Sequence, residues 1–217
     1  MALPAKIEFF AQSLRNGTTV GAVWPSSKAL AEAMVEPVFE NRPSHLRILE
    51  VGAGVGPFTA ELVKRLEPGD TLDVVELNPA FCRVLRDRFA EAPVPPTVHE
   101  VSITAFQADR PYHHIVSGLP LANFPADLVE AVYARYRDLL VEDGTFVMFE
   151  HIFFRRALSM VTLGAYRRRI RQVMAIESQL ESDIVGRRSV LLNVPPAQVT
   201  VRRRPTVLPR LVGTTAR

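Results

Sequence analysis

The sequence predicts an α/β fold, in which a mostly parallel sheet carries helices on both faces. Three observations lead to this prediction. Apolar, β-branched segments alternate with helical ones, one strand runs into a glycine-rich turn at 47–56, and a second strand ends in an acid about 20 residues further on. With 217 residues, 47% of them hydrophobic, the chain suits one domain of this kind with some additions.

An amphipathic helix is predicted near the N-terminus, within a segment 1–20 that precedes the main domain at 21–205. Its apolar side chains recur at helical spacing, and two adjacent phenylalanines widen the stripe. Such a stripe either packs on the domain or enters a lipid interface, and the pattern leaves both alternatives open. The residues concerned are Ile7, Phe9, Phe10 and Leu14.

The other elements follow from periodicity and turn residues. A short helix capped by Ser26 or Ser27 is expected to run toward Glu36, with Pro37 disturbing its continuation. A further helix is expected in the basic segment, broken near Gly164, and 206–217 is expected to be a loose tail. The remaining helices are predicted at 57–66, 79–90 and 126–140, and the strands at 71–76, 97–101, 115–117, 144–150, 189–192 and 198–203.

The glycine turn is the first candidate binding feature. The strand ends in Glu50, glycines follow at alternate positions, and a helix begins at Pro57. Glycines admit a ligand to the bare backbone, and a helix N-terminus adds free N–H donors. A dinucleotide site would place its third glycine at position 57, which is proline here. The alternative is a strand–helix turn without a ligand. The glycines are Gly52, Gly54 and Gly56.

The second candidate feature is Glu76, the acid that ends the strand 71–76. At the end of the second strand of a doubly wound sheet, an acid can accept hydrogen bonds from both ribose hydroxyls. The alternative for Glu76 is a solvated loop carboxylate. Together the two features predict a nucleoside-containing cofactor at one edge of the sheet.

Charge and composition limit the surroundings of the protein. The net charge is only +3, yet residues 151–175 contain no acid and include six arginines. Such a segment implies a membrane surface or a nucleic acid as partner, with a solvated helix face as the alternative. No apolar run reaches the roughly 18 residues that span a bilayer, and no secretory signal is visible. The single cysteine, Cys82, is expected to be a buried hydrophobe, and a reducing cytoplasm is expected.

The E-x-G-x-G-x-G pattern at 50–56 resembles motif I of the class I S-adenosylmethionine-dependent methyltransferases. Four more segments narrow this resemblance to the soluble bacterial phospholipid N-methyltransferases, and the likeness covers nearly the whole chain. These enzymes convert phosphatidylethanolamine to its methylated forms and on to phosphatidylcholine, and relatives act on ornithine lipids. The segments are F-F-A-Q-S-L-R-N-G at 9–17, V-W-P-S-S-K-A-L at 23–30, S-G-L-P-L at 117–121 and N-V-P-P-A-Q-V at 193–199.

The resemblance implies a seven-stranded, Rossmann-like sheet, S-adenosyl-L-methionine as cofactor, and no metal. Trp24 is either core or one wall of the cofactor pocket, because an aromatic face suits a methyl-sulfonium cation. Many class I enzymes place an acid after the third strand, where this chain has Ser102. The family usually also carries an acid before the fourth strand, which is absent near His113 and His114. The expected cofactor residues are Glu50, Gly52, Gly54, Gly56, Glu76, Leu77, Ser102, Ile103, Ser117 and Trp24.

An amino-lipid acceptor requires a group that removes a proton. A primary alkylamine has a pKa of about 10, so it arrives protonated and must regain its lone pair. His151, after the fifth strand, is the candidate base, and Glu150 beside it could first bind the ammonium. The alternative for His151 is a hydrogen-bonded structural histidine. Leu119 and Asn123 are expected to line the acceptor side.

An anionic phospholipid membrane surface is the expected partner, and no nucleic acid is expected. The apolar N-terminal stripe and the arginines Arg167, Arg168 and Arg169 supply the two components of interfacial binding. The protein is therefore expected at the inner face of the cytoplasmic membrane. The rivals are an RNA adenine methyltransferase and a non-catalytic lipid-surface protein. Against the first, the loop at 117–120 reads S-G-L-P rather than N-P-P-Y.

Overall fold

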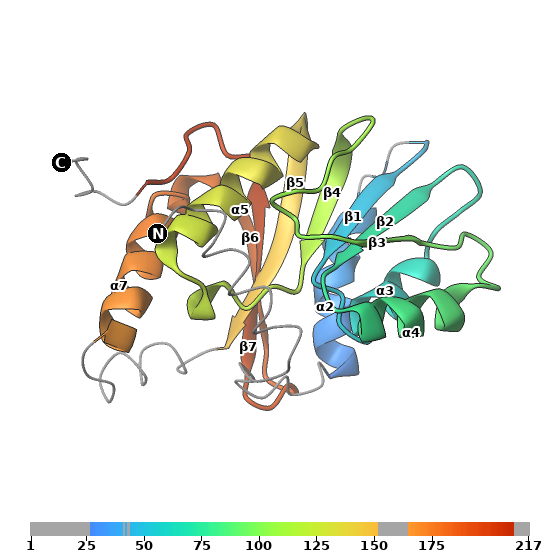
Figure 1. The fold of residues 1–217 in the computed structure, drawn as a ribbon, viewed down its shortest axis with the longest axis horizontal. Coiled ribbons are helices and arrows are strands. Elements are labelled where there is room, and N and C mark those ends of the chain that lie inside the picture. Colours follow the sequence, from blue (N-terminus) through green and yellow to red (C-terminus); the bar gives the residue numbers. More distant parts are fainter. Residues whose placement is uncertain (1–26, 41, 43, 152–164, 211–217) are drawn as a thin grey trace.

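The computed structural model describes residues 27–40, 42, 44–151 and 165–210. The predicted N-terminal helix with its lipid-facing residues, Trp24 and the possible break near Gly164 lie outside these residues. The described chain forms a seven-stranded sheet in the order β3-β2-β1-β4-β5-β7-β6 (Figure 1). The predicted fold class is thereby confirmed.

The first five strands are parallel to their neighbours, and β7 runs antiparallel between β5 and β6. The carboxyl ends of β1 to β6 therefore share one edge, the carboxyl edge, which lies at the bottom in Figure 1. We call the opposite edge the amino edge. The strands are β1 Arg47–Val51, β2 Thr71–Glu76, β3 Thr97–Glu100, β4 Tyr112–Ser117, β5 Leu140–His151, β6 Ile184–Val190 and β7 Ala197–Arg203.

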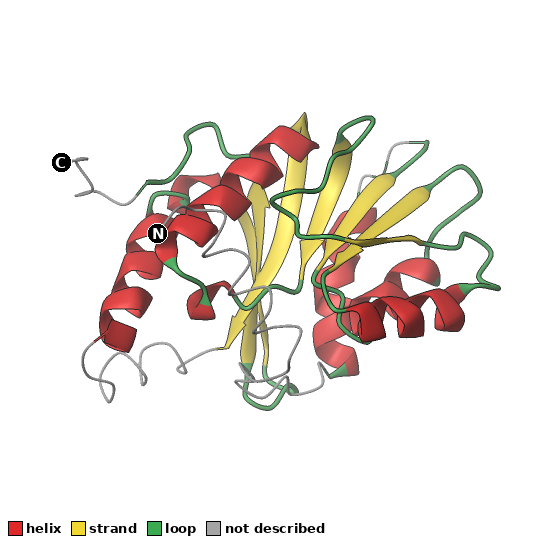
Figure 2. Ribbon diagram, viewed as in Figure 1, coloured by secondary structure: helices red, strands yellow, loops and turns green. Residues whose placement is uncertain are grey.

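Helices cover both faces of the sheet (Figure 2). One buried cluster joins the sheet to α2, α3 and α4, and a second joins it to α5 and α7. No helix in the described ranges is both long enough and apolar enough to cross a bilayer. The helices are α2 Lys28–Phe39, α3 Pro57–Val63, α4 Pro79–Phe89, η1 Leu121–Asn123, α5 Ala126–Leu139, α7 Ala165–Ser178 and η2 Glu181–Asp183.

Three sequence predictions need correction. Helix α2 continues through Pro37 to Phe39, because proline late in a helix removes only one backbone donor. The sixth strand spans Ile184–Val190, so Leu191 and Leu192 lie in the following turn and not in a strand at 189–192. The fourth strand begins at Tyr112, so the adjacent histidines belong to β4 and do not precede it.

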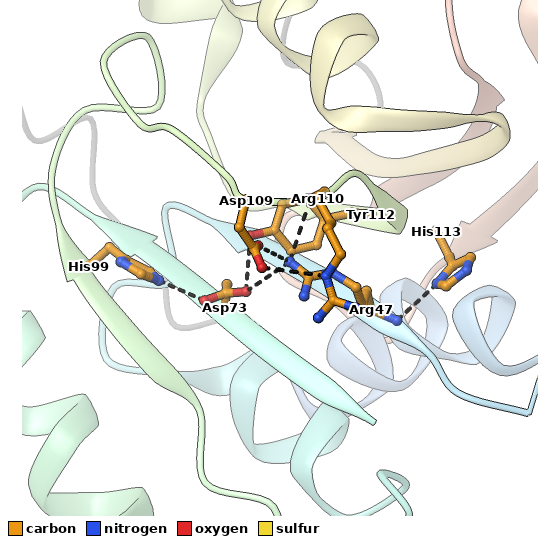
Figure 3. A network of polar contacts seen from close by, with 7 residues as sticks. All are labelled: Arg47, Asp73, His99, Asp109, Arg110, Tyr112 and His113. Carbon is orange, nitrogen blue, oxygen red and sulfur yellow. Dashed lines mark hydrogen bonds and ion pairs between the residues drawn. The ribbon is translucent and has the colours of Figure 1, made fainter. Parts of the chain in front are cut away.

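A polar network ties the amino halves of β1, β2 and β4 together (Figure 3). The Asp73 carboxylate accepts a hydrogen bond from the Tyr112 hydroxyl at 2.9 Å and lies 2.6 Å from His99 Nε2. The Arg47 guanidinium donates to Asp109 at 2.8 Å and lies 4.0 Å from Asp73. Burial, reinforced by the neighbouring Asp73, raises the pKa of the Tyr112 hydroxyl. Each acid of this network therefore has a donor or cation beside it.

His113 and His114 also make structural contacts at the amino edge. The backbone N–H of Arg47 donates to His113 Nδ1 at 2.9 Å, and His114 Nδ1 lies 2.8 Å from the Thr145 hydroxyl. Burial, together with the neighbouring His113, lowers the pKa of His114 to about 4. These positions confirm that the two histidines lie away from the carboxyl edge.

Candidate functional site

The glycine turn lies at the carboxyl edge between β1 and α3, and its three glycines have different roles. A Cβ on Gly56 would come within 2.8 Å of Leu85, so this glycine lets α3 approach α4. A Cβ on Gly52 would come within 2.7 Å of Leu119 of the loop after β4. At Gly54, with φ +58°, no atom lies within 4 Å of the corresponding position. Gly54 therefore presents bare backbone to open space, where a ligand can approach it.

The Glu76 carboxylate holds this turn from the end of β2. Its Oε2 accepts from the Gly54 N–H at 2.8 Å, and its Oε1 accepts from the N–H groups of Leu77 and Asn78, each at 2.8 Å. A carboxylate offers about four lone-pair directions, so these three bonds leave acceptor capacity on Oε2. Glu76 thus fixes the glycine turn and can still accept from a ribose hydroxyl. Leu77 contributes its backbone donor.

Glu50 is the most perturbed acid of the carboxyl edge. It is fully buried in β1, beside Val74 of β2 and Val116 of β4. Neither carboxylate oxygen has a well-formed hydrogen bond to a described residue. Burial raises the pKa of Glu50 to about 8, and hydrogen bonding by Thr59 opposes this rise only in part. A buried carboxyl without a strong partner, next to a ligand-binding turn, suits a cationic ligand group.

The loop after β4 packs directly against the glycine turn. The Gly118 N–H donates to the Val51 carbonyl at 2.8 Å, and a Cβ on Gly118 would lie 2.6 Å from the Gly52 carbonyl oxygen. Gly118 was not among the predicted site residues, although S-G-L-P-L was singled out as a motif. The Ser117 hydroxyl accepts from the Tyr136 hydroxyl at 2.7 Å. The side chain of Ser117 is therefore engaged by α5, and contact between Ser117 and the cofactor stays a prediction.

Ser102 and Ile103 follow β3 and differ in exposure. Ile103 is buried in the cluster under α5, whereas Ser102 is half-buried. The Ser102 hydroxyl lies 2.9 Å from that of Thr104, and its carbonyl accepts from the N–H groups of Ala105 and Phe106. Both residues stand at the carboxyl edge, as predicted, while contact with an adenine stays a prediction.

His151 ends β5 at the same edge. Its Nδ1 lies 3.2 Å from the Pro195 carbonyl, and its ring packs edge-on against Phe149 at 5.5 Å. A carbonyl only accepts hydrogen bonds, so this contact favours the tautomer that carries the proton on Nδ1 and the lone pair on Nε2. Glu150 precedes His151 and pairs with Gln198 of β7. The sequence thus correctly placed both residues at the carboxyl edge of the sheet, whereas their role in the chemistry stays a prediction.

Asn193 is a residue of this region that the prediction missed. It is buried in the loop after β6, donates to the Pro195 carbonyl at 2.8 Å and accepts from the Ser27 N–H at 3.0 Å. The same carbonyl therefore faces both Asn193 and His151. The sequence marked N-V-P-P as part of a family motif, but only the fold shows that this segment contacts His151 and the start of α2.

The basic segment has a more mixed role than predicted. Arg168 is exposed, whereas Arg167 and Arg169 are half-buried. Arg169 donates to the Asn123 carbonyl at 3.2 Å, so it joins α7 to the short η1 helix after β4. Asn123 and Leu119 both lie in this post-β4 loop, on the predicted acceptor side. Cys82 is buried and its thiol donates to the Glu76 carbonyl at 3.3 Å, which confirms its structural role.

These groups fit S-adenosylmethionine. Gly54 offers open backbone, Glu76 offers an acceptor for a ribose hydroxyl, and Glu50 is a buried carboxyl that suits the vicinity of an ammonium. Glu50 and Glu76 are buried carboxyl groups beside this turn, and the Arg88 guanidinium donates to the Val55 carbonyl at 3.0 Å. The fold and the site together define a class I S-adenosylmethionine-dependent methyltransferase.

Comparison with known proteins agrees with this class. Residues 48–144 match the methyltransferase domain family. An ornithine lipid N-methyltransferase from Singulisphaera acidiphila is 30% identical over an alignment of 166 residues, and the match covers 71% of this chain and 85% of the relative. The chain belongs to the class I S-adenosylmethionine-dependent methyltransferases, and S-adenosyl-L-methionine is its cofactor.

Solved structures share the fold at low sequence identity. The N-methyltransferase NodS from Bradyrhizobium japonicum, in complex with S-adenosyl-L-homocysteine, has a TM-score of 0.63 at 15% identity, covering 90% of this chain and 98% of its own. Magnesium protoporphyrin IX methyltransferase from Synechocystis, also with bound S-adenosyl-L-homocysteine, has a TM-score of 0.59 at 14% identity, covering 82% of this chain and 83% of its own. The predicted cofactor and fold are confirmed.

Proposed function

We propose that this methyltransferase N-methylates the primary amine of an amino lipid at a membrane surface. The observation that carries the proposal is the position of His151, whose Nδ1 faces the Pro195 carbonyl at the same sheet edge as the glycine turn and Glu76. Amine methylation requires a proton acceptor at that edge, and the favoured tautomer carries the lone pair on Nε2.

The chemistry divides between the cofactor and the chain. When bound, the cofactor supplies an electrophilic methyl group on a sulfonium. Glu150 attracts the acceptor ammonium, and His151 takes up its proton, so that the nitrogen lone pair forms the new C–N bond as the C–S bond breaks. The Asp73 network at the amino edge has no part in this step.

Two amino lipids compete as acceptor, phosphatidylethanolamine and ornithine lipid. The resemblance to phospholipid N-methyltransferases supports the first, with successive methylation toward phosphatidylcholine. The relative that is 30% identical bears the name of an ornithine lipid enzyme, which supports the second. Both lipids offer a primary alkylamine, so the proposal concerns their shared chemistry.

Membrane contact is the second part of the proposal. A two-chain lipid must be met at a surface, and the N-terminal segment 1–20 and the arginines of α7 supply apolar and electrostatic attraction. The protein would then act as a peripheral protein at the inner face of the cytoplasmic membrane.

Transfer of radiolabelled methyl groups tests the proposed function. Labelled S-adenosylmethionine is supplied in parallel with phosphatidylethanolamine vesicles, ornithine lipid vesicles and bulk RNA. Label in either lipid supports the proposal and identifies the preferred headgroup. Label in RNA alone, or in no acceptor despite intact cofactor binding, contradicts it.

A further inference from the structure

The loop 191–196 between β6 and β7 exposes a group of large apolar side chains. Leu191 is 73% exposed, Leu192 83% and Val194 66%. Single exposed leucines are common on protein surfaces, but three large apolar residues within four positions form a patch that usually marks an interaction site. The patch is therefore a candidate for contact with a partner.

Polar contacts fix the orientation of this loop. Asn193, between the exposed residues, is buried and joins the Ser27 N–H to the Pro195 carbonyl at 3.0 and 2.8 Å. Val190, directly before the loop, is also buried. Because the domain holds these inward residues, the loop has a fixed conformation in which Leu191, Leu192 and Val194 point outward.

The loop lies beside the candidate acceptor site. Strand β6 ends at the carboxyl edge, and its Val190 pairs with Ala197 of β7. Ala197 pairs on its other side with His151 of β5. The loop thus belongs to the same edge of the sheet as the proposed base, and Figure 1 shows the connection between β6 and β7 at the lower edge.

Basic residues flank this edge. Helices α2 and α7 both begin here, and neither has an acid in its first turn. Lys28 at the start of α2 has a side chain that is 77% exposed, although its ammonium lies 3.6 Å from Glu32, and Arg168 in α7 is exposed. Cations near a helix N-terminus oppose the helix dipole, so they cost stability unless an anionic surface lies opposite.

We propose that the loop 191–194 inserts into the interfacial region of an anionic membrane, with Lys28 and Arg168 facing the headgroups. Apolar side chains flanked by cations are the combination that binds such an interface. This inference rests on the proposed function, because it names the surface through which the enzyme meets a lipid substrate. It also orients the enzyme, with the carboxyl edge and His151 directed toward the bilayer.

The test compares two variants of the full chain. Leu191→Gln with Leu192→Gln removes the apolar contacts, and Val207→Gln changes an equally exposed residue (71%) beyond the amino-edge end of β7. Flotation with vesicles of phosphatidylcholine and phosphatidylglycerol measures binding. The double variant is expected to bind the vesicles at least about tenfold more weakly than the parent, and Val207→Gln is expected to bind like the parent.

Activity on two forms of one lipid separates this inference from the proposed function. The double variant should keep the parent rate on monomeric dihexanoyl phosphatidylethanolamine and lose rate on vesicles. If the parent methylates neither phosphatidylethanolamine nor ornithine lipid in either form, the proposed function fails, while flotation still decides the role of the loop. Unchanged flotation of the double variant overturns the inference. Two other results would also overturn the inference. If light scattering shows that the double variant has lost self-association, a second copy of the chain covers the loop. If Trp24 fluorescence of the double variant shifts in the absence of vesicles, the N-terminal segment covers it.

Discussion

Asp73 at the amino edge and Glu50 at the carboxyl edge differ in how their carboxylates are satisfied. At the amino edge, Asp73 has the Tyr112 hydroxyl, His99 and the Arg47 guanidinium around it. At the carboxyl edge, Glu50 is buried with no well-formed bond to a described residue, and its pKa rises to about 8. Polar groups that serve the fold alone find partners within it, whereas an incompletely satisfied acid beside an open turn indicates a place for a ligand.

The glycines differ between the regions in the same way. Gly118 lies where two loops of the carboxyl edge touch, and any side chain there meets the backbone of Gly52. Gly186, in the outer strand β6, has only ordinary contacts at 3.6 Å from Val201. The site therefore depends on backbone packing that the periphery does not need.

The largest expected effect comes from Gly118→Val. Since its Cβ would lie 2.6 Å from the Gly52 carbonyl oxygen, the glycine turn must move. We expect a loss of about 1–3 kcal/mol in unfolding free energy and of at least about 100-fold in affinity for S-adenosylhomocysteine. Urea unfolding and calorimetric titration measure the two. Gly186→Ala serves as the control, and equal effects of both substitutions would contradict this account of the turn.

His151→Asn should act on chemistry alone. The variant keeps a polar side chain at the end of β5 but removes the proposed base, so kcat is expected to fall about 100-fold or more. Affinity for S-adenosylhomocysteine should stay within about twofold of the parent, because a substitution at one site usually has little effect on a separate site. Steady-state kinetics across pH provide the check. A purely structural histidine would instead lower stability and leave the pH profile of the remaining activity unchanged.

Glu50→Gln should change how stability depends on pH. The folded-state pKa of about 8 exceeds the ordinary 4.5, so the folded protein holds the Glu50 proton more tightly than the unfolded chain. Without cofactor, the parent should lose stability as pH rises from about 4.5 to about 8, by on the order of a few kcal/mol, and then level off. Glu50→Gln should flatten this part of the curve. An unaltered slope in urea unfolding between these pH values would refute the assignment.

Tyr112→Phe should have the smallest effect. It removes one hydrogen bond to Asp73 but leaves His99 and Arg47 beside that carboxylate. We expect a loss of about 1 kcal/mol in unfolding free energy and no change in affinity for S-adenosylhomocysteine. A weakened affinity would show that the amino edge communicates with the cofactor site.

Local signals in the sequence were sufficient for the glycine turn and for Glu76. Glycines at alternate positions after an acid, and a strand that ends in an acid, predict the turn and the carboxylate beside it before any packing is known, whereas the contact of Glu76 with a ribose stays a prediction. Exposed loops are harder, because Leu191 and Leu192 have the composition of a strand but follow its end. Apolar character alone does not distinguish burial in a sheet from exposure at a loop tip.

Contacts between distant segments could not be predicted in this way. Gly118 is required because the chain after β4 passes over Gly52, and Asn193 matters because it meets Ser27, 166 residues away. The Asp73 network likewise joins residues of β1, β2, β3 and β4. Each depends on strand order and register, which local periodicity does not specify.

Calorimetric titration with S-adenosylhomocysteine of the parent, Glu76→Gln and Asp73→Asn tests the central claim most directly. Glu76 accepts from the Gly54 N–H and is the predicted acceptor for a ribose hydroxyl, whereas Asp73 belongs to the amino-edge network. We predict that Glu76→Gln weakens binding at least about tenfold, through loss of charge-assisted hydrogen bonds, and that Asp73→Asn leaves affinity within about twofold. Parent-like affinity of Glu76→Gln, with weakened binding by Asp73→Asn, would contradict the assignment of the cofactor site to the carboxyl edge.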